Sequence, residues 1–406
     1  METKELQAVV NPIYTTAKGT VLMLKGGGDP DARKLAPYLD LSELQKRPTT
    51  TPQEIKRCYV VSQEARYGIN NEATLRSGKP VIIDLPCGYS PRGFRVTDAG
   101  KRYFGFDLPI VIDEMKDASK KAMSEQQWAA STFAAVDATN YESLRNALGD
   151  VKGELCIITE GLLGYFSESE LVSMCQAVHR LLAEFGGCWI TADSGILEIY
   201  GLTFGALLQS DQKAFLERIK GHATRMADVD FYQNSLFLNG PDGAKAFLKS
   251  QGFDVKAESV SAYLPEMRTV SGDEYHKLKN AYRKMEIWTM TANQTAGKSE
   301  KPIDLNLPFE ARSELTDGLF TVSVQGRMDT ITAPELLKQF QEAGEGIEAI
   351  CVDVSRMPYV SSAGLRVLLM MYKSLADKDK FEMRGVSEDV REILETTGFD
   401  QFLLKE

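Results

Sequence analysis

Four acidic side chains stand at or just beyond the ends of four apolar runs. Asp84 ends the run VIID (81–84), and Asp107, Asp137 and Glu160 follow the next three runs along the chain. In an open parallel sheet, ligands bind at the carboxyl ends of the strands. A carboxylate there can accept the hydroxyl hydrogens of a ribose, or the hydrogens of an exocyclic amine such as that of adenine. A single acid at such a place is more often a helix cap or a loop residue, but four in succession predict a nucleoside site.

The turn after the first run limits the kind of nucleoside. Its sequence, DLPCGYSPRG (84–93), contains no GxGxxG pattern, which argues against a dinucleotide and a bound pyrophosphate. A nucleoside without phosphates, held by acids rather than by glycine amides, indicates S-adenosylmethionine. The sulfonium of this cofactor is cationic, so an acidic rim also suits it electrostatically.

The elements that must position these acids form an alternating pattern. Seven apolar, strand-like runs lie between residues 81 and 293, with helical stretches such as VIDEMKDASKKAM (111–123) between them. Strands that alternate with helices indicate a doubly wound, Rossmann-like α/β sheet with helices on both faces. Helical patterns before the first run, notably over 54–78, predict a helical cap over about residues 1–78. The predicted strands are 81–86, 103–109, 132–139, 154–161, 186–195, 255–263 and 286–293.

A chain of 406 residues is too long for one ordinary core, and two domains are expected. The polar stretch 294–310 contains two prolines and separates two differently organised regions. We expect a large domain over 1–298, a linker over 299–312 and a small α/β domain over 313–406. In the small domain, the predicted strands are 318–329, 348–355 and 381–387, and the predicted helices are 332–345, 362–377 and 388–399.

Composition argues against several classes of partner. The net charge of −10 does not suit nucleic acid, because phosphate binding needs a basic surface. No apolar run reaches the roughly 18 residues of a membrane span, and the first residues lack the layout of a signal peptide. We therefore expect a cytoplasmic protein without a membrane partner. The six cysteines form no CxxC pair and the three histidines lie far apart, so neither a disulfide framework nor a metal site is indicated.

Two blocks of the large domain resemble those of a known family. The segment YFGFDLPIVIDEMK (103–116) is similar to the block that follows the second strand of class I S-adenosylmethionine-dependent methyltransferases of the leucine carboxyl methyltransferase-like group. The segment ITEGLLGYFS (158–167) is similar to the block after the fourth strand of that group. CGYSPR (87–92) lies where the group has a glycine-rich turn ending in Asp-Thr-Arg.

This resemblance implies roles for the predicted site residues. Asp107 would hold the ribose, and Glu160 would lie near the methionine portion of S-adenosylmethionine. Asp137 with Ala138 would meet the adenine. The full predicted cofactor site is Arg66, Asp84, Gly88, Asp107, Asp137, Ala138 and Glu160.

The first turn is where the chain departs from that group. The resemblance implies that Gly88 lets the backbone approach the cofactor and that Arg66 pairs with the cofactor carboxylate. Pro86 stands where the group has its first glycine and Ser90 where it has aspartate, and proline has no amide hydrogen to offer. An alternative therefore stays open, in which the chain is a signalling protein and this domain is its catalytically degenerate sensor of S-adenosylmethionine or a related nucleoside.

The leading prediction is O-methylation of a small-molecule or carboxylate acceptor. Methyl transfer mainly needs the nucleophile, methyl and sulfur to be aligned. A carboxylate or phenolate acceptor needs no general base, and the sequence assigns no catalytic residue.

A serine pair marks the small domain, in the segment YVSSAGLR (359–366) between a predicted strand and helix. Serine is a favoured N-cap, which accounts for one of the two, Ser361 and Ser362. Gly364 inside the first helical turn costs about 0.5–1 kcal/mol relative to alanine, which predicts a close approach of another backbone or of a partner.

Residues 315–406 resemble the STAS domains of anti-sigma factor antagonists. The resemblance rests on VQGRMDTITAPELL (324–337), on VDVSRMPYVSSAGLRVLL (352–369) and on the last helix with Gly398 and Phe399. It implies that Ser362 is phosphorylated by a partner serine kinase or anti-sigma factor, while Ser361 stands where the family often has aspartate. The chain is therefore predicted to be a methyltransferase that carries a regulatory STAS module.

Overall fold

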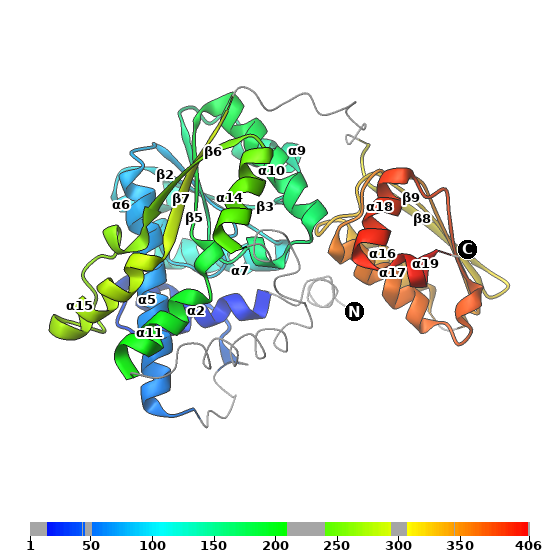
Figure 1. Ribbon diagram of the computed structural model, residues 1–406. Coiled ribbons are helices and arrows are strands. Elements are labelled where there is room, and N and C mark those ends of the chain that lie inside the picture. The colour runs from blue at the N-terminus through cyan, green and yellow to red at the C-terminus, as the bar shows by residue number, and fades with distance from the viewer. Residues whose placement is uncertain are drawn as a thin grey trace. The chain divides into compact units, whose positions relative to one another are not determined.

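The computed structural model describes residues 14–42, 44, 51–208, 240–293, 307–344 and 346–404. It divides into two compact units, Ile13–Gly297 and a unit that includes Lys298–Glu406. Each unit has its own sheet and its own hydrophobic core (Figure 1). Residues 299–306 of the predicted linker lie outside the described residues. Among the helices that are described, none combines the length and the apolar character needed to cross a membrane.

The large unit contains a seven-stranded sheet in the order β3-β2-β1-β4-β5-β7-β6. Every predicted strand is present, and β1 to β5 are parallel to one another, which confirms the doubly wound sheet. Strand β7 is antiparallel to both of its neighbours, which the apolar pattern did not predict. The strands are β1 (Val81–Asp84), β2 (Arg102–Asp107), β3 (Ser131–Ala135), β4 (Leu155–Thr159), β5 (Gly187–Thr191), β6 (Phe253–Ser259) and β7 (Glu286–Ala292).

Helices cover both faces of this sheet. On one face, α9 (Tyr141–Leu148), α10 (Glu168–Phe185) and α14 (Gly240–Ser250) pack on a core that includes Ile83 and Trp189. On the other, α5 (Gln53–Arg76) contacts β4 and β5, while α6 (Arg92–Asp98) and α7 (Pro109–Ala122) contact β2. Strands β1 and β4 are buried along their whole length, which is why they are continuous apolar runs in the sequence.

The reversal of β7 follows from the path of the chain after β6. Helix α15 (Gly272–Ala281) and the short helices η4 (Val260–Ala262) and η5 (Tyr282–Lys284) connect β6 to β7. Residues Ser259 and Glu286 pair across the two strands, so the connection starts and ends at the same edge of the sheet. Because the chain does not cross back over a face of the sheet, β7 must run in the opposite direction.

The described part of the predicted N-terminal cap is helical. It consists of α2 (Tyr14–Gly26), α3 (Pro30–Leu35), a short helix η1 (Ala36–Tyr38) and α5. Asp29 caps α3 and is buried, and its carboxylate pairs with Arg95 of α6 at 2.6 Å. The cap helices are thereby tied to the helix that follows the first strand.

The small unit has a four-stranded sheet in the order β11-β10-β9-β8. Strands β9 (Leu319–Gln325), β10 (Ala349–Arg356) and β11 (Phe381–Arg384) are parallel and were predicted. Strand β8 (Glu310–Thr316) pairs antiparallel with β9 and includes the last residues of the predicted linker. The helices are α16 (Ala333–Ala343), α17 (Ser362–Ser374), α18 (Glu388–Thr397) and α19 (Asp400–Leu403).

Candidate functional site

The candidate site lies at the point where the order of the large sheet reverses. Strands β1 and β4 are neighbours, and the chain continues from β1 to β2 on one side and from β4 to β5 on the other. Ligands of open α/β sheets bind in the crevice at such a switch point. Asp84 is the last residue of β1 and Glu160 directly follows β4, so two of the four predicted acids meet here.

A buried arginine joins these two acids. Arg92, the first residue of α6, is 1% exposed. Its Nε donates to Asp84 Oδ2 at 3.0 Å, its Nη1 donates to Asn71 Oδ1 at 3.0 Å, and its Nη2 donates to Glu160 Oε2. Sequence reasoning did not assign Arg92 to the site. The only signal for it was its place at the end of the block CGYSPR.

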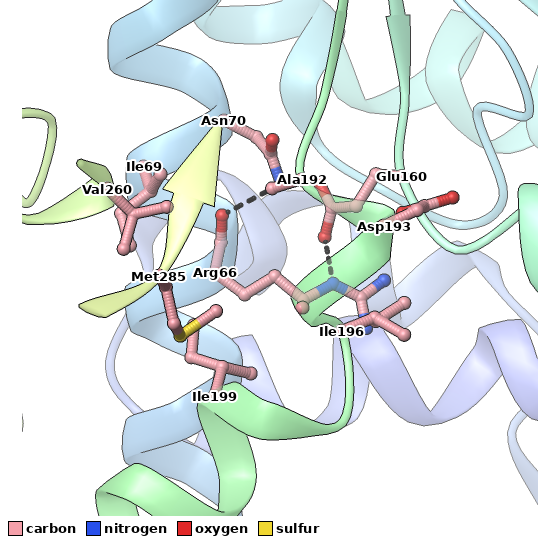
Figure 2. A pocket seen from close by; sticks show the side chains of 11 residues that line it. Arg66, Ile69, Asn70, Glu160, Ala192, Asp193, Ile196, Ile199, Val260 and Met285 are labelled. Carbon is pink, nitrogen blue, oxygen red and sulfur yellow. Dashed lines mark hydrogen bonds and ion pairs between the residues drawn. The ribbon is translucent and has the colours of Figure 1, made fainter. Parts of the chain in front are cut away.

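A second arginine reaches Glu160 from the cap. Arg66 lies on α5, and its Nε donates to Glu160 Oε1 at 2.7 Å (Figure 2). Burial alone would raise the pKa of Glu160, but Arg66 and Arg92 outweigh it and hold that pKa below its ordinary value. The structure thus brings together Arg66, Asp84 and Glu160 of the predicted site, with Arg92 as the link.

Asp84 keeps one unused oxygen in this cluster. Its Oδ2 accepts from Arg92 and from the hydroxyl of Tyr103, at 3.0 Å each. Its Oδ1 is buried and has no hydrogen-bond partner among the described residues. Burial raises the pKa of Asp84, although Arg92 opposes the shift.

Gly88 and Asp107, two further residues of the predicted site, are hydrogen-bonded to each other. Gly88 has a positive φ of 50°, and its amide donates to Asp107 Oδ2 at 2.7 Å. The amide of Leu108 donates to Asp107 Oδ1, also at 2.7 Å. Burial raises the pKa of Asp107 to about 7, and the two amides only partly offset this shift. The first turn is therefore tied to the carboxyl end of β2.

Asp137 lies beyond the end of β3 and orders its own turn. Its Oδ1 accepts from the amide and the hydroxyl of Thr139, at 2.9 and 2.8 Å. Ala138 is half-buried and packs against the main core. The amide of Val136 donates to the carbonyl of Asp107, so the ends of β2 and β3 lie side by side.

Asp193 is a further acid that sequence reasoning missed. It follows β5, is buried, and accepts from the amides of Gly161, Leu162 and Leu163 at 2.7 to 3.0 Å. These amides belong to the segment EGLLGY, so Asp193 fixes the turn that presents Glu160. In the described parts of the chain, no cluster of three or more His, Cys, Asp or Glu side chains is arranged to hold a metal ion.

The cap helix α2 covers the first turn. A Cβ added at Gly88 would lie 3.5 Å from the Cβ of Ala17, on α2. Lys18, the next residue of α2, pairs with Glu114 of α7 at 2.8 Å, and the hydroxyl of Tyr89 donates to the same carboxylate at 2.9 Å. These contacts place α2 over the carboxyl ends of β1 and β2.

The serine pair of the small unit divides into one buried and one exposed side chain. Ser361 is the N-cap of α17, is buried, and accepts from the amide of Gly364 at 3.3 Å. Ser362 is the first residue of α17 and is exposed. A Cβ at Gly364 would lie 2.7 Å from the carbonyl oxygen of Met328. The predicted close approach of another backbone is confirmed.

Comparison with known proteins bears most directly on this small unit. A family model described as "Mlab, STAS domain" matches residues 312–405. The protein BtrV of Bordetella bronchiseptica, named as an anti-sigma factor antagonist, is 31% identical over 85 residues, which are 20% of this chain and 73% of that protein. The C-terminal unit belongs to the STAS domain family. The STAS domain therefore carries the serine pair at the start of α17.

The chain is also similar to solved methyltransferase structures. These include an O-methyltransferase family protein from Burkholderia thailandensis (TM-score 0.36, 10% identity, 69% of this chain and 73% of that chain). They also include the magnesium protoporphyrin IX methyltransferase of Synechocystis PCC 6803 with bound SAH (TM-score 0.37, 12% identity, 63% and 97%).

Proposed function

We propose that the unit Ile13–Gly297 is an S-adenosylmethionine-dependent O-methyltransferase of the leucine carboxyl methyltransferase-like group, and that the STAS domain is its regulatory or protein-interaction module. One observation carries this proposal. Glu160 is held between Arg66 and Arg92 at the switch point of the sheet, next to the Gly88–Asp107 pair. This is the crevice in which an open α/β sheet binds its ligand.

The residues present fit a nucleoside with a cationic centre. Asp84 Oδ1 is a buried acceptor without a hydrogen-bond partner among the described residues. A ligand that donates a hydrogen bond to this oxygen would remove the free-energy cost of leaving it unpaired. Asp84 and Glu160 meet at the switch point and are paired with Arg66 and Arg92, so their charges are balanced. Asp107 adds one negative charge when it is ionised, and this charge favours a cation such as a sulfonium.

Five of the predicted residues then have a task in binding. Asp107 accepts the ribose hydroxyls, Asp137 and Ala138 border the adenine, and Arg66 pairs with the carboxylate of the cofactor. Glu160 holds Arg66 in the orientation that this pairing needs. When bound, the cofactor supplies an electrophilic methyl group, and the chain aligns a small-molecule or carboxylate acceptor with it.

Calorimetric titration of the full chain with S-adenosylmethionine tests the cofactor assignment. We expect a binding heat with the natural protein, and an affinity at least about tenfold lower in Asp107→Ala because charge-assisted hydrogen bonds are lost. Asp150→Ala, at an exposed position, serves as the control and is expected to bind normally. No heat with the natural protein would remove the cofactor from the proposal.

A second candidate, a degenerate sensor, is favoured by the first turn. The Gly88 amide already donates to Asp107, and Pro86 has no amide hydrogen to offer. A sensor would bind S-adenosylmethionine and transfer no methyl group to any acid, phenol or alcohol offered with it. Methyl transfer to even one acceptor class excludes this candidate.

We further propose that Ser362 is the residue that a partner serine kinase phosphorylates. Ser362 is exposed at the N-terminus of α17, where the partial positive charge of the helix end tolerates a phosphate. The modification would add nearly two negative charges to a docking surface. Ser361 is buried and serves as a cap, which makes it a poor kinase substrate.

The two serine variants separate these roles. With a cognate anti-sigma kinase and ATP, Ser362→Ala is expected to take up no phosphate. Ser361→Ala is expected to take up phosphate, but to lose about 1 kcal/mol of stability with its cap. Full incorporation into Ser362→Ala, measured by intact mass, would move the site elsewhere.

A further inference from the structure

Two cysteines lie side by side in the large sheet. Cys156 is the second residue of β4 and Cys188 is the second residue of β5, and the register of these parallel strands pairs the two directly. Paired residues of neighbouring parallel strands project from the same face of a sheet. Both side chains are free thiols, and the two residues are 0% and 3% exposed. Two cysteines that are far apart in the sequence are thereby brought into one buried pair.

The two strands are pressed together just before this pair. Gly187, which precedes Cys188, has a positive φ of 108°. A Cβ built at Gly187 would lie 1.9 Å from the carbonyl oxygen of Leu155, which precedes Cys156. Because this obstacle is backbone, only a residue without a side chain fits there.

This close approach matters for the distance between the two sulfurs. Paired residues of neighbouring strands are ordinarily about 4.8 Å apart, whereas the Cβ atoms of a disulfide are about 3.5–4.5 Å apart. A small further approach of β4 and β5 is therefore enough to let the two sulfurs bond.

The surroundings of the pair favour loss of a proton from Cys188. The thiol of Cys156 donates a hydrogen bond to the sulfur of Cys188 and thereby lowers the pKa of Cys188, although burial opposes the shift. The ammonium of Lys79 lowers this pKa further. The same hydrogen bond, together with burial, raises the pKa of Cys156. Cys188 is therefore the nucleophile of the pair, and Cys156 keeps its proton.

The pair lies near the rim of the sheet at which β4 and β5 begin. Glu154, directly before β4, is exposed, and Gly186, directly before β5, is half-buried. Lys79 pairs with Glu154 at 2.8 Å, and 25% of the Lys79 side chain is exposed. A surface ion pair contributes only about 0–1 kcal/mol, so the Lys79 side chain is easily displaced. A small oxidant therefore has a short path to Cys188.

We propose that Cys156 and Cys188 are an oxidative modification site, at which a peroxide links β4 to β5 by a disulfide. The thiolate of Cys188 attacks one oxygen of hydrogen peroxide, the O–O bond breaks, and a sulfenic acid and hydroxide form. The sulfur of Cys156 then attacks the sulfenic sulfur, the S–O bond breaks, and the proton of Cys156 leaves with the hydroxyl group as water. The two sulfurs together lose two electrons, which the peroxide gains.

The disulfide joins the two strands that carry part of the candidate site. Glu160 follows β4 and Asp193 follows β5, at the ends opposite the cysteine pair. A disulfide between directly paired strands is strained, because it must hold them closer than the sheet does, and strained disulfides are easily reduced. The modification is therefore reversible.

Treatment of the reduced full chain with stoichiometric hydrogen peroxide tests the proposal, with glutathione at the same pH as the reference for the rate. We expect thiol loss at least as fast as that of glutathione, an intact mass lower by two hydrogens, and a cross-link between the peptides that contain Cys156 and Cys188. Dithiothreitol is expected to restore the mass. The remaining cysteines, Cys58, Cys87, Cys175 and Cys351, are expected to stay thiols because burial raises the pKa of each or leaves it without a paired thiol.

Three outcomes would overturn the proposal. They are no oxidation while glutathione reacts, oxidation of Cys188 to sulfinic acid without a cross-link, and a disulfide that involves any other cysteine. The readouts are a mass and a cross-linked peptide, so they depend neither on cofactor binding nor on methyl transfer.

Three variants separate the roles within the pair. Cys156→Ala lacks the resolving thiol and is expected to gain one oxygen at Cys188, trapped by dimedone, more slowly because the hydrogen bond to Cys188 is lost. Cys188→Ala is expected to leave Cys156 a thiol. Cys175→Ala, at another buried cysteine, is expected to form the cross-link normally. Equal oxidation of both pair variants would also overturn the proposal. If these variants do not fold, the peptide map of the natural protein still decides the question.

Discussion

Asp107 is buried, yet its carboxylate accepts two backbone amides. Burial is the larger influence and raises the pKa of Asp107 to about 7, from an ordinary value of 3.8. Because this pKa is higher in the folded protein, the protonated side chain contributes stability that is complete below about pH 4. That contribution is lost as the pH rises through 7. The protonation state of Asp107 also affects the affinity for any ligand that donates a hydrogen bond to its carboxylate.

We predict that the affinity for S-adenosylmethionine rises between pH 6 and pH 8, by up to about tenfold, as Asp107 becomes ionised. Ribose hydroxyls donate hydrogen bonds, and an ionised carboxylate is the stronger acceptor. Calorimetric titrations at pH 6, 7 and 8 measure the slope. Asp107→Asn is expected to bind weakly with little pH dependence, and an unchanged slope in this variant would assign the titration to another group.

The residue types in the sequence predicted part of the candidate site, but not the hydrogen bonds that join its side chains. Asp107 and Glu160 were found because acids at strand ends are visible in the sequence. Arg92 and Asp193 act through partners that are 68 and 30 to 32 positions away, respectively. Their roles depend on how α6 and the β5 turn approach β4, which no local pattern records.

Among the elements, the junction of β10 with α17 shows how tightly the STAS domain is packed. Gly364 lies in the first turn of α17, against the carbonyl oxygen of Met328 and the side chain of Val360. Because the obstacle at 2.7 Å is backbone, it cannot rotate away as a side chain would. Glycine lowers the stability of the helix relative to alanine, but it has no Cβ that would collide with this carbonyl oxygen.

We predict that Gly364→Ala destabilises the STAS domain by about 1–3 kcal/mol, although alanine is the better helix former. Denaturant unfolding followed by circular dichroism measures the change. Gly26→Ala provides a matched control, because a Cβ at the end of α2 would meet nothing within 4 Å. A neutral or stabilising effect of Gly364→Ala would contradict the close approach.

All strands of the large sheet were found from apolar runs. The pattern is strongest in β1 and β4, which are buried along their whole length because helices cover both faces of the sheet, and weakest in β6, which is mostly exposed or half-buried. Strand β8 was missed because its sequence, EARSELT, is mostly exposed and holds only one large apolar residue, Leu315. The direction of β7 was missed because direction depends on the connection through α15 and not on the strand.

At the scale of the whole molecule, two units with separate cores share one chain. Only the unit Ile13–Gly297 holds the proposed nucleoside site. A ligand stabilises the unit that binds it, by about 2.7 kcal/mol when its concentration is a hundred times the dissociation constant.

We predict two transitions in differential scanning calorimetry of the full chain. S-adenosylmethionine is expected to raise the midpoint of one transition and to leave the STAS transition in place. Asp107→Ala is expected to abolish the shift without moving the second transition. A single cooperative transition, or an equal shift of both, would show that the units are coupled.

The sheet of the STAS domain ends at β8, at the edge opposite β11. An edge strand offers backbone donors and acceptors to any extended segment that meets it, and can seed the growth of fibrils. In β8, Glu310, Arg312 and Glu314 recur at every second position and are all exposed. Burying these charges against a strand of another molecule would cost free energy. The polar sequence of β8, which is the reason that the strand was not predicted, therefore also protects the domain from aggregation.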